Sequence, residues 1–175
     1  MPPNTNTSPE EIRGWFAGRL PDGWFTQAPE VIADRDEILV VGTLAEPGLP
    51  AEASEEARSA ALASRITGHR EDTREQRMRI AEEARRLFGR TVSWGARCGD
   101  REALFTTLSV PAMTRLRMPE RKVLDTLVDA GVARSRSHAL AWCVRLVADK
   151  QEDWLADLRQ ALTHVEKVRD QGPVR

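Results

Sequence analysis

Residues 113–119 read Met-Thr-Arg-Leu-Arg-Met-Pro, residues 120–131 read Glu-Arg-Lys-Val-Leu-Asp-Thr-Leu-Val-Asp-Ala-Gly, and residues 135–145 read Ser-Arg-Ser-His-Ala-Leu-Ala-Trp-Cys-Val-Arg. This order predicts a short strand, a helix that ends at a glycine and a second helix that begins at a serine. A strand this short is not stable by itself and needs a second copy beside it. Two such strands would form a basic ribbon of the width that the major groove of DNA admits.

The predicted strand has two different faces, because successive side chains of a strand point in opposite directions. One face carries two arginines and the other is mostly apolar. The first face consists of Met113, Arg115 and Arg117, and the second of Thr114, Leu116 and Met118.

Two amphipathic helices are predicted after this strand. The first begins at Pro119, whose missing N–H costs nothing at that position, and ends at Gly131. The second begins at the helix cap Ser135. The backbone N–H groups of residues 135–138 would point outward from its start and, with Arg134 and Arg136 beside them, predict a phosphate-binding site. The buried faces would be Val123, Leu124, Leu127 and Val128 in the first helix, and Ala139, Leu140, Cys143, Val144 and Val147 in the second.

The segment 113–147 resembles the ribbon-helix-helix family of dimeric DNA-binding proteins. The resemblance is carried by Arg115-Leu-Arg-Met-Pro-Glu120, by Gly131 and by Ser135-Arg-Ser-His-Ala-Leu140. It implies base contacts by one strand face, phosphate contacts at the start of the second helix, and a shared dimer core. The implied base contacts are Met113, Arg115 and Arg117, the phosphate contacts are Arg134, Ser135, Arg136 and Ser137, and the core residues are Leu116, Met118, Leu124, Leu127, Leu140 and Val144.

This sequence departs from the family pattern in two places. A whole domain and Pro111 precede the ribbon, and His138 stands where an acidic residue would complete a capping box. Two other interpretations stay open. Arg115 and Arg117 could be ordinary residues that protect an edge strand from pairing, and Ser135 could cap its helix without any phosphate.

Residues 10–110 predict a small α+β domain in which two hairpins pack on one or two helices. Residues 1–9 are expected to form a disordered tail, and a helix over residues 10–20 would be capped by Ser8. The two hairpins would join residues 31–32 to 38–44 and residues 91–94 to 103–110.

Two further helices are predicted between the hairpins, over residues 57–66 and 73–88. The longer one would begin at the capping box Thr73-Arg-Glu-Gln76 and end at Gly89. Its exposed side would form an arginine face of Arg74, Arg77, Arg85 and Arg86.

Pro111 is expected to begin a C-terminal module over residues 111–170. Beyond residue 147 the chain is expected to stay helical, because Leu155, Leu158, Leu162 and Val165 recur at helical spacing. Such a seam is long enough to cover a dimer core or to bind a partner helix.

The net charge of −1 conceals an uneven distribution along the chain. Residues 1–57 hold eleven acidic and three basic side chains, and residues 58–175 hold sixteen acidic and twenty-three basic ones, so the balances are −8 and +7. Most of the cations are arginines, whose fixed fork suits phosphate and guanine. A GC-rich genome would explain the arginine content but not its distribution.

Several kinds of site are not expected. Cys98 and Cys143 lie far apart and should be free thiols, and the three scattered histidines add no zinc-ligand spacing. No apolar run reaches the ~20 residues that span a bilayer, and no signal-peptide pattern is present, so a cytoplasmic location without membrane contact is expected. No nucleophile–base motif or phosphate-binding glycine loop is recognised, so no catalytic residue, cofactor or metal is assigned.

The sequence therefore predicts a sequence-reading DNA-binding homodimer, either a transcriptional regulator or a chromosome-associated protein, with double-stranded DNA as its partner. The alternative is a protein-interaction adaptor or antitoxin, in which the ribbon-helix-helix module is mainly a dimerisation core. A protein partner would then bind the N-terminal domain or the C-terminal helix.

Overall fold

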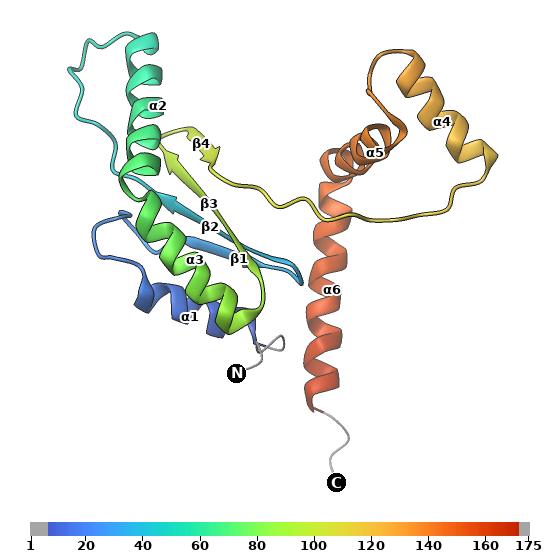
Figure 1. The fold of residues 1–175 in the computed structure, drawn as a ribbon, viewed down its shortest axis with the longest axis horizontal. Helices are drawn as coiled ribbons and strands as arrows, with labels where there is room; N and C mark the ends of the chain where they lie inside the picture. The colour runs from blue at the N-terminus through green and yellow to red at the C-terminus, as the bar shows by residue number, and fades with distance from the viewer. Residues whose placement is uncertain (1–6, 172–175) are drawn as a thin grey trace. The chain divides into compact units, whose positions relative to one another are not determined.

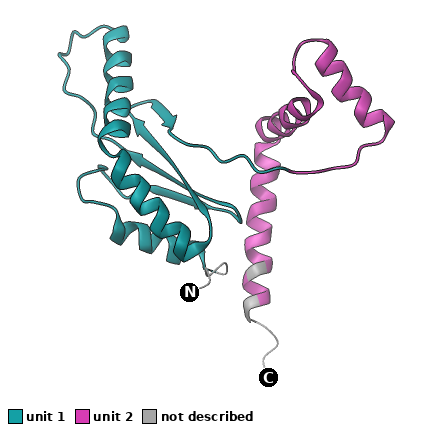
Figure 2. Cartoon of the chain, in the orientation of Figure 1, with its two compact units in different colours: residues 1–111 teal, residues 112–175 magenta. Residues whose placement is uncertain are grey.

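The computed structural model describes residues 7–171, except for the side chains of residues 166, 170 and 171. The chain divides into two compact units, unit 1 (residues 1–111) and unit 2 (residues 112–175), which Figure 2 shows in different colours. The described residues form a mixed α+β protein with one four-stranded sheet and six helices, which are labelled in Figure 1.

Unit 1 contains all the strands among the described residues. Its elements are α1 (Pro9–Arg19), β1 (Glu30–Ala33), β2 (Glu37–Thr43), α2 (Glu55–Asp72), α3 (Arg74–Phe88), β3 (Thr91–Cys98) and β4 (Arg101–Leu104). The strand order in the sheet is β1-β2-β3-β4. β1 pairs antiparallel with β2, and β3 with β4, so both predicted hairpin pairings are confirmed.

The two hairpins are nevertheless parts of one sheet, because β2 and β3 pair in parallel, with Val40 opposite Trp94. Parallel strands need a crossover connection of about a dozen residues or more, and α2 and α3 together supply it. The continuous apolar run of residues 38–44 is typical of a central strand, which β2 is. The pattern did not identify β3 as its second neighbour.

The three helices of unit 1 cover one face of the sheet. Side chains of α1 and α3, among them Phe16 and Ile80, pack on Val40 and Trp94. Ile66 of α2 packs on residues 96 and 98, farther along β3. Alternate residues of a strand share a face, so both core clusters lie on the same side of β3.

One position of β2 has to be glycine because an aromatic ring lies against the backbone there. A Cβ atom at Gly42 would collide with the ring of Phe25. Phe25 packs against the buried cluster that contains Leu44 and Ala96, so it cannot move away without opening that cluster. The close approach fixes the segment before β1 against the sheet.

The start of α1 follows the predicted pattern closely. The Ser8 hydroxyl accepts a hydrogen bond from the Glu11 N–H at 3.2 Å, and the Glu11 carboxylate accepts one from the Ser8 N–H at 2.9 Å. This is a complete capping box, with Pro9 in the first turn. Ser8 and Pro9 thus belong to the helix and not to a disordered tail, and residues 1–6 lie outside the described residues.

The capping box predicted at residues 73–76 is wrong. α2 is longer than predicted and reaches Asp72, so Thr73 already has near-helical angles (φ −95°, ψ 0°), and its side chain makes no cap hydrogen bond. The Thr73 hydroxyl instead donates to the carbonyl of His69 at 2.6 Å. Gly89 ends α3 in the left-handed conformation, with φ 70°, as predicted.

Arg77 is buried, contrary to the predicted arginine face, and only 6% of it is exposed. Its guanidinium carbon lies 4.8 Å from the ring centre of Phe105 and 6.0 Å from that of Trp94. The guanidinium donates to the Arg70 carbonyl at 2.7 Å and to the Thr73 hydroxyl at 3.0 Å. Burial lowers the pKa of Arg77. Arg77 is therefore part of the core that joins α2, α3 and the sheet.

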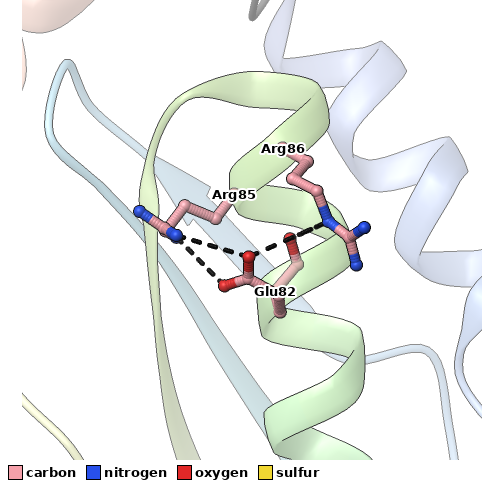
Figure 3. Close-up of polar contacts among 3 residues, drawn as sticks. All are labelled: Glu82, Arg85 and Arg86. Carbon is pink, nitrogen blue, oxygen red and sulfur yellow. Dashed lines mark hydrogen bonds and ion pairs between the residues drawn. The ribbon is translucent and has the colours of Figure 1, made fainter.

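Two other arginines of α3 are partly neutralised within the helix, as Figure 3 shows. The Glu82 carboxylate accepts hydrogen bonds from Arg85 at 3.1 and 3.3 Å, and Arg86 Nε lies 3.8 Å from the same carboxylate. These hydrogen bonds lower the pKa of Glu82. The exposed side of α3 is thus less basic than the sequence predicted.

The strand predicted over residues 103–110 is much shorter than expected, because β4 ends at Leu104. The chain then has no regular secondary structure up to residue 117. Two side-chain contacts still hold its first part on unit 1. Thr106 accepts a hydrogen bond from the Trp94 N–H at 3.1 Å, and the Leu108 N–H donates to the Glu37 carboxylate at 3.1 Å.

Unit 2 consists of three helices in its described residues: α4 (Met118–Asp129), α5 (Arg136–Lys150) and α6 (Glu152–Gln171). α6 confirms that the chain stays helical beyond residue 147. None of the helices that the structure describes is long and apolar enough to cross a membrane.

Candidate nucleic-acid interface

The α4–α5 pair is joined by a short turn that the sequence predicted correctly. Gly131 has φ 75°, a conformation that favours glycine. Two residues later the Ala133 N–H donates to the Leu127 carbonyl at 3.0 Å. Ala133 is buried together with Leu124 of α4 and Ala139 of α5. The turn therefore sets the two helices against one small shared core.

The start of α5 is capped as predicted, and a histidine adds a bond that the sequence did not reveal. The Ser135 hydroxyl accepts a hydrogen bond from the His138 N–H at 3.2 Å. His138 Nδ1 accepts one from the Arg134 N–H at 3.2 Å. In a capping box an acidic side chain at this position would accept a hydrogen bond from the N–H of the cap residue, Ser135. His138 makes a similar bond, but with the N–H of the preceding residue, Arg134.

Arg136 links α5 to α4, a contact that sequence spacing alone could not identify. Its guanidinium donates to both carboxylate oxygens of Asp125, at 2.6 and 2.8 Å. The Arg136 hydrogen bond lowers the pKa of Asp125. In this bidentate arrangement Arg136 fixes the start of α5 beside the middle of α4.

The four expected phosphate contacts lie together at the start of α5. Arg134, Ser135, Arg136 and Ser137 are all exposed. Among them, Arg136 is engaged by Asp125, whereas the side chain of Arg134 makes no hydrogen bond or ion pair with another side chain in the described part of unit 2. A phosphate at this helix start would therefore meet backbone N–H groups first, with Arg136 available only by exchange with Asp125.

The expected ribbon segment is not part of the sheet of unit 1. Residues 113–117 have no regular secondary structure in the single chain, and Arg117 has an extended backbone (φ −81°, ψ 174°). Met118 is the first residue of α4, so its assignment to the strand was wrong. Pro119 occupies the first turn of α4, where its ring and its missing N–H are compatible with the helix.

The exposure of the segment agrees with the predicted alternation only at residues 115–117, because Thr114 and Met118 of the other predicted face are exposed as well. Met113 is 99% exposed, and Arg115 and Arg117 are exposed as well. Leu116 instead packs on the small core of α4 and α5, and its carbonyl accepts a hydrogen bond from Arg121 at 2.8 Å. The two arginines thus face away from the core on either side of a leucine that contacts it.

The expected dimer-core residues divide into two groups. Leu124 is buried, and Leu116, Leu127 and Leu140 are half-buried around it. Met118 and Val144 are 60% and 64% exposed. The first group forms the core of a single unit 2, and the second group lies on its surface.

Among its described residues, unit 2 exposes more large hydrophobic side chains than it buries. Its buried hydrophobic residues, among those described, are Leu124, Ala133 and Ala139. A hollow of about 330 Å³ lies beside this core and is bordered by residues 112–116, α4 and α5. The large hydrophobic residues that unit 2 exposes before α6 begins include Met113, Met118, Val123, Val132, Val144, Leu146 and Val147.

The positive charge of unit 2 is concentrated where the ribbon and the two helix starts lie. Residues 112–136 contain six basic and three acidic side chains, a balance of +3. Residues 137–175 contain six of each, a balance of zero. The division made at residue 57 from the sequence falls inside α2 and therefore does not separate the two units. The excess of positive charge in residues 112–136, in contrast, lies within a single unit.

Other kinds of site find no support among the described residues. Cys98 is buried in unit 1 and Cys143 is half-buried in unit 2, and both are free thiols. Burial raises the pKa of the Cys98 thiol. No group of three or more His, Cys, Asp or Glu side chains in the described part of the chain is placed to hold a metal ion.

Comparison with known proteins assigns the chain to a family. Residues 10–104 match the family model of the Rv1265-like protein N-terminal domain, and residues 117–169 match that of the Mb1296 C-terminal domain. The chain belongs to the Rv1265-like family. The two family models correspond to unit 1 and unit 2, and the second begins at Arg117, next to α4.

Mycobacterial relatives in this family are similar over most of the chain. The uncharacterized protein Mb1296 of Mycobacterium bovis is 56% identical over 159 residues, which cover 91% of this chain and 69% of the relative. The uncharacterized protein Rv1265 of Mycobacterium tuberculosis H37Rv has the same identity and coverage. No solved structure matches the chain.

Proposed function

We propose that this member of the Rv1265-like family is a sequence-reading DNA-binding homodimer. Residues 113–117 of two copies would pair antiparallel and enter the major groove as a two-stranded ribbon. The observation that carries the proposal is the exposure pattern of this segment. Arg115 and Arg117 are exposed on both sides of Leu116, which packs on the α4–α5 core.

Dimerisation through unit 2 would cover apolar surface that the single chain leaves exposed. Three buried residues among those described are a small core for this unit, and domains of its size are only marginally stable by themselves. Met118 and Val144 would gain cover in the dimer. The unpaired backbone of residues 113–117 would also gain hydrogen-bond partners, which a strand needs to be stable.

Sequence preference would come from the four arginines that the ribbon of a dimer presents. A bidentate contact between an arginine and guanine contributes about 1–3 kcal/mol of discrimination against other bases. Met113 is fully accessible and could add an apolar contact to a thymine methyl group.

Affinity without sequence preference would come from the start of α5. Its backbone N–H groups lie at the positive end of the helix, where a phosphate binds well. Arg134 and the local excess of positive charge in residues 112–136 add to this attraction. If the dimer neutralises about six phosphates, log affinity should fall against log salt with a slope of about −5.

The proposal is tested by the double variant Arg115→Ala and Arg117→Ala. It should keep the oligomeric state and the helix content of the natural chain, and it should lose sequence preference in a selection from random DNA. The matched control is Arg145→Ala with Lys150→Ala, which removes the same charge from exposed positions outside residues 112–136. Undiminished preference in the first variant would reject these arginines as base-reading residues.

The second candidate is a protein-interaction adaptor or antitoxin. It is favoured by one observation, the exposed apolar side chains of α6, which are not explained by DNA binding. Retention on random-sequence DNA that is lost as salt increases would support the first candidate. Absence of retention in low salt would favour the second.

A further inference from the structure

α6 carries an apolar stripe that the described part of unit 2 leaves uncovered. The helix contacts α5 near its start, where Leu155 borders a hollow of about 460 Å³ shared with α5. In proteins most of the stability of a helix comes from packing of its apolar face, so such a stripe normally packs against another element. The stripe consists of Trp154, Leu158, Leu162, Val165 and Val168, which are 42% to 60% exposed.

We propose that α6 pairs antiparallel with α6 of a second copy of this chain. The inference does not depend on DNA binding and would stand if the ribbon bound no DNA. A stripe on one helix that is long enough for two heptads fits a second helix of the same length. Antiparallel pairing of identical helices has two-fold symmetry, as most homodimers do.

The charges of α6 select the antiparallel direction. Residues 152–158 contain three carboxylates and no cation, whereas residues 159–171 contain three cations and two carboxylates. In a parallel pair the two acidic starts would lie side by side and repel each other. In an antiparallel pair each acidic start would lie along residues 165–171 of its partner, where two cations balance two carboxylates, so this repulsion is removed.

The side-chain sizes along the stripe also suit an antiparallel pair of α6 helices. With the two-fold axis midway between Ala161 and Leu162, each alanine lies opposite a leucine of the other copy. Leu158 would then lie opposite Val165 of the second copy. Small residues opposite large ones allow two helices to approach closely and fill the space between them.

Cysteine cross-linking of the full chain tests both the pairing and its direction, on a background of Cys98→Ala and Cys143→Ser. Leu162→Cys lies next to the axis and should form an intermolecular disulfide. Val168→Cys alone should form about tenfold less, because its two copies would be roughly 20 Å apart along the helices, beyond disulfide reach. An equimolar mixture of Leu158→Cys and Val165→Cys should cross-link between the two variants.

Two outcomes would overturn the pairing. Equal cross-linking by Leu162→Cys and Val168→Cys would indicate parallel helices, and no cross-linking in any of the three samples would show that another partner covers the stripe. Sedimentation adds a second measurement, in which Leu162→Glu should weaken self-association at least tenfold. Thr163→Glu, an equal charge change outside the stripe, should leave it unchanged.

Failure of this inference can be distinguished from failure of the proposed function. Loss of DNA preference in the variant Arg115→Ala with Arg117→Ala should leave cross-linking through Leu162→Cys intact. Cross-linking without any DNA binding would support α6 pairing and reject the ribbon. DNA binding without cross-linking would support the ribbon and reject α6 pairing.

Discussion

Replacing Arg77 tests whether a buried cation holds α2 and α3 of unit 1 together. In Arg77→Leu the Arg70 carbonyl loses the donor that lies at 2.7 Å, and the Thr73 hydroxyl loses the one at 3.0 Å. A buried polar group without a partner costs about 1–3 kcal/mol. The lost contact with the ring of Phe105, at 4.8 Å, adds about 0.5–2 kcal/mol.

Part of this cost is recovered, because Arg77→Leu also removes a charge that folding buries. We therefore expect the free energy of unfolding to fall by about 2–3 kcal/mol, which is less than the sum of the separate losses. The assay is urea unfolding of the full chain, followed by tryptophan fluorescence, because Trp94 lies in this core.

The matched control is Arg74→Leu, which removes the same charge from an exposed position of the same helix. A surface substitution of this kind should change the free energy of unfolding by about 0.5 kcal/mol or less. Equal small losses in Arg77→Leu and Arg74→Leu would refute the reasoning. They would mean that the guanidinium of Arg77 contributes nothing beyond an ordinary surface arginine.

Three further perturbations have definite expected results. Gly42→Ala should lower the melting temperature and reduce the free energy of unfolding by about 1–3 kcal/mol, because the new methyl group would collide with Phe25. An unchanged melting temperature would contradict this contact. Asp125→Asn should release Arg136 and, if Arg136 then reaches a phosphate, make the salt slope of DNA binding steeper by about 0.9 per protomer. Burial lowers the pKa of His69 in the folded chain, so unfolding should become easier as the pH falls below about 6.5, and His69→Gln should reduce this dependence.

The direction of the His69 effect follows from its surroundings. The unfolded chain binds a proton more readily than the folded chain, because folding places the ring against Trp24, Phe25 and Phe105 and near the cation of Arg77. Stability from the neutral ring is therefore present above the ordinary pKa of about 6.5 and decreases as the pH falls through the lower folded value. A stability that is flat between pH 7 and pH 5 in both chains would contradict this.

Most features that depend on a few neighbouring residues could be predicted from the sequence. The cap at Ser8, the glycine turn at Gly131 and the cap at Ser135 each need only three or four residues, and the structure has all three. The capping box predicted at Thr73 is the exception, because α2 extends to Asp72. The same is true of the two hairpin pairings. Hydrogen bonds between residues that are close in the chain hold these features in place.

Features that depend on distant packing could not be predicted in this way. The parallel pairing of β2 with β3 is established only when α2 and α3 pack on the sheet. Arg77 was assigned to solvent because of its charge, although helical spacing places it on the same face as Ile80 and Ala84, which are buried. The rings of Phe105 and Trp94 cover its guanidinium. The Asp125–Arg136 pair joins residues that are 11 positions apart across a turn.

In the candidate interface, too, some features depend on neighbouring residues and others on distant packing. Its chemical groups could be identified from sequence, because arginines that alternate with apolar residues before a proline form a local pattern. How far the start of α5 is available to phosphate depends on the Asp125 contact, which only the folded arrangement reveals. The pairing of two ribbon segments requires a second chain and remains a proposal.

The most direct test of the central claim is the distance between spin labels on two copies of the chain, measured one position at a time at residues 113, 115 and 117. In an antiparallel ribbon centred on these residues, moving the label by two positions changes its separation along the strands by about 13 Å. The shortest distance should be at residue 115, with longer distances at both ends. A distance that changes in one direction through the three positions, or no distance between copies, would contradict the ribbon.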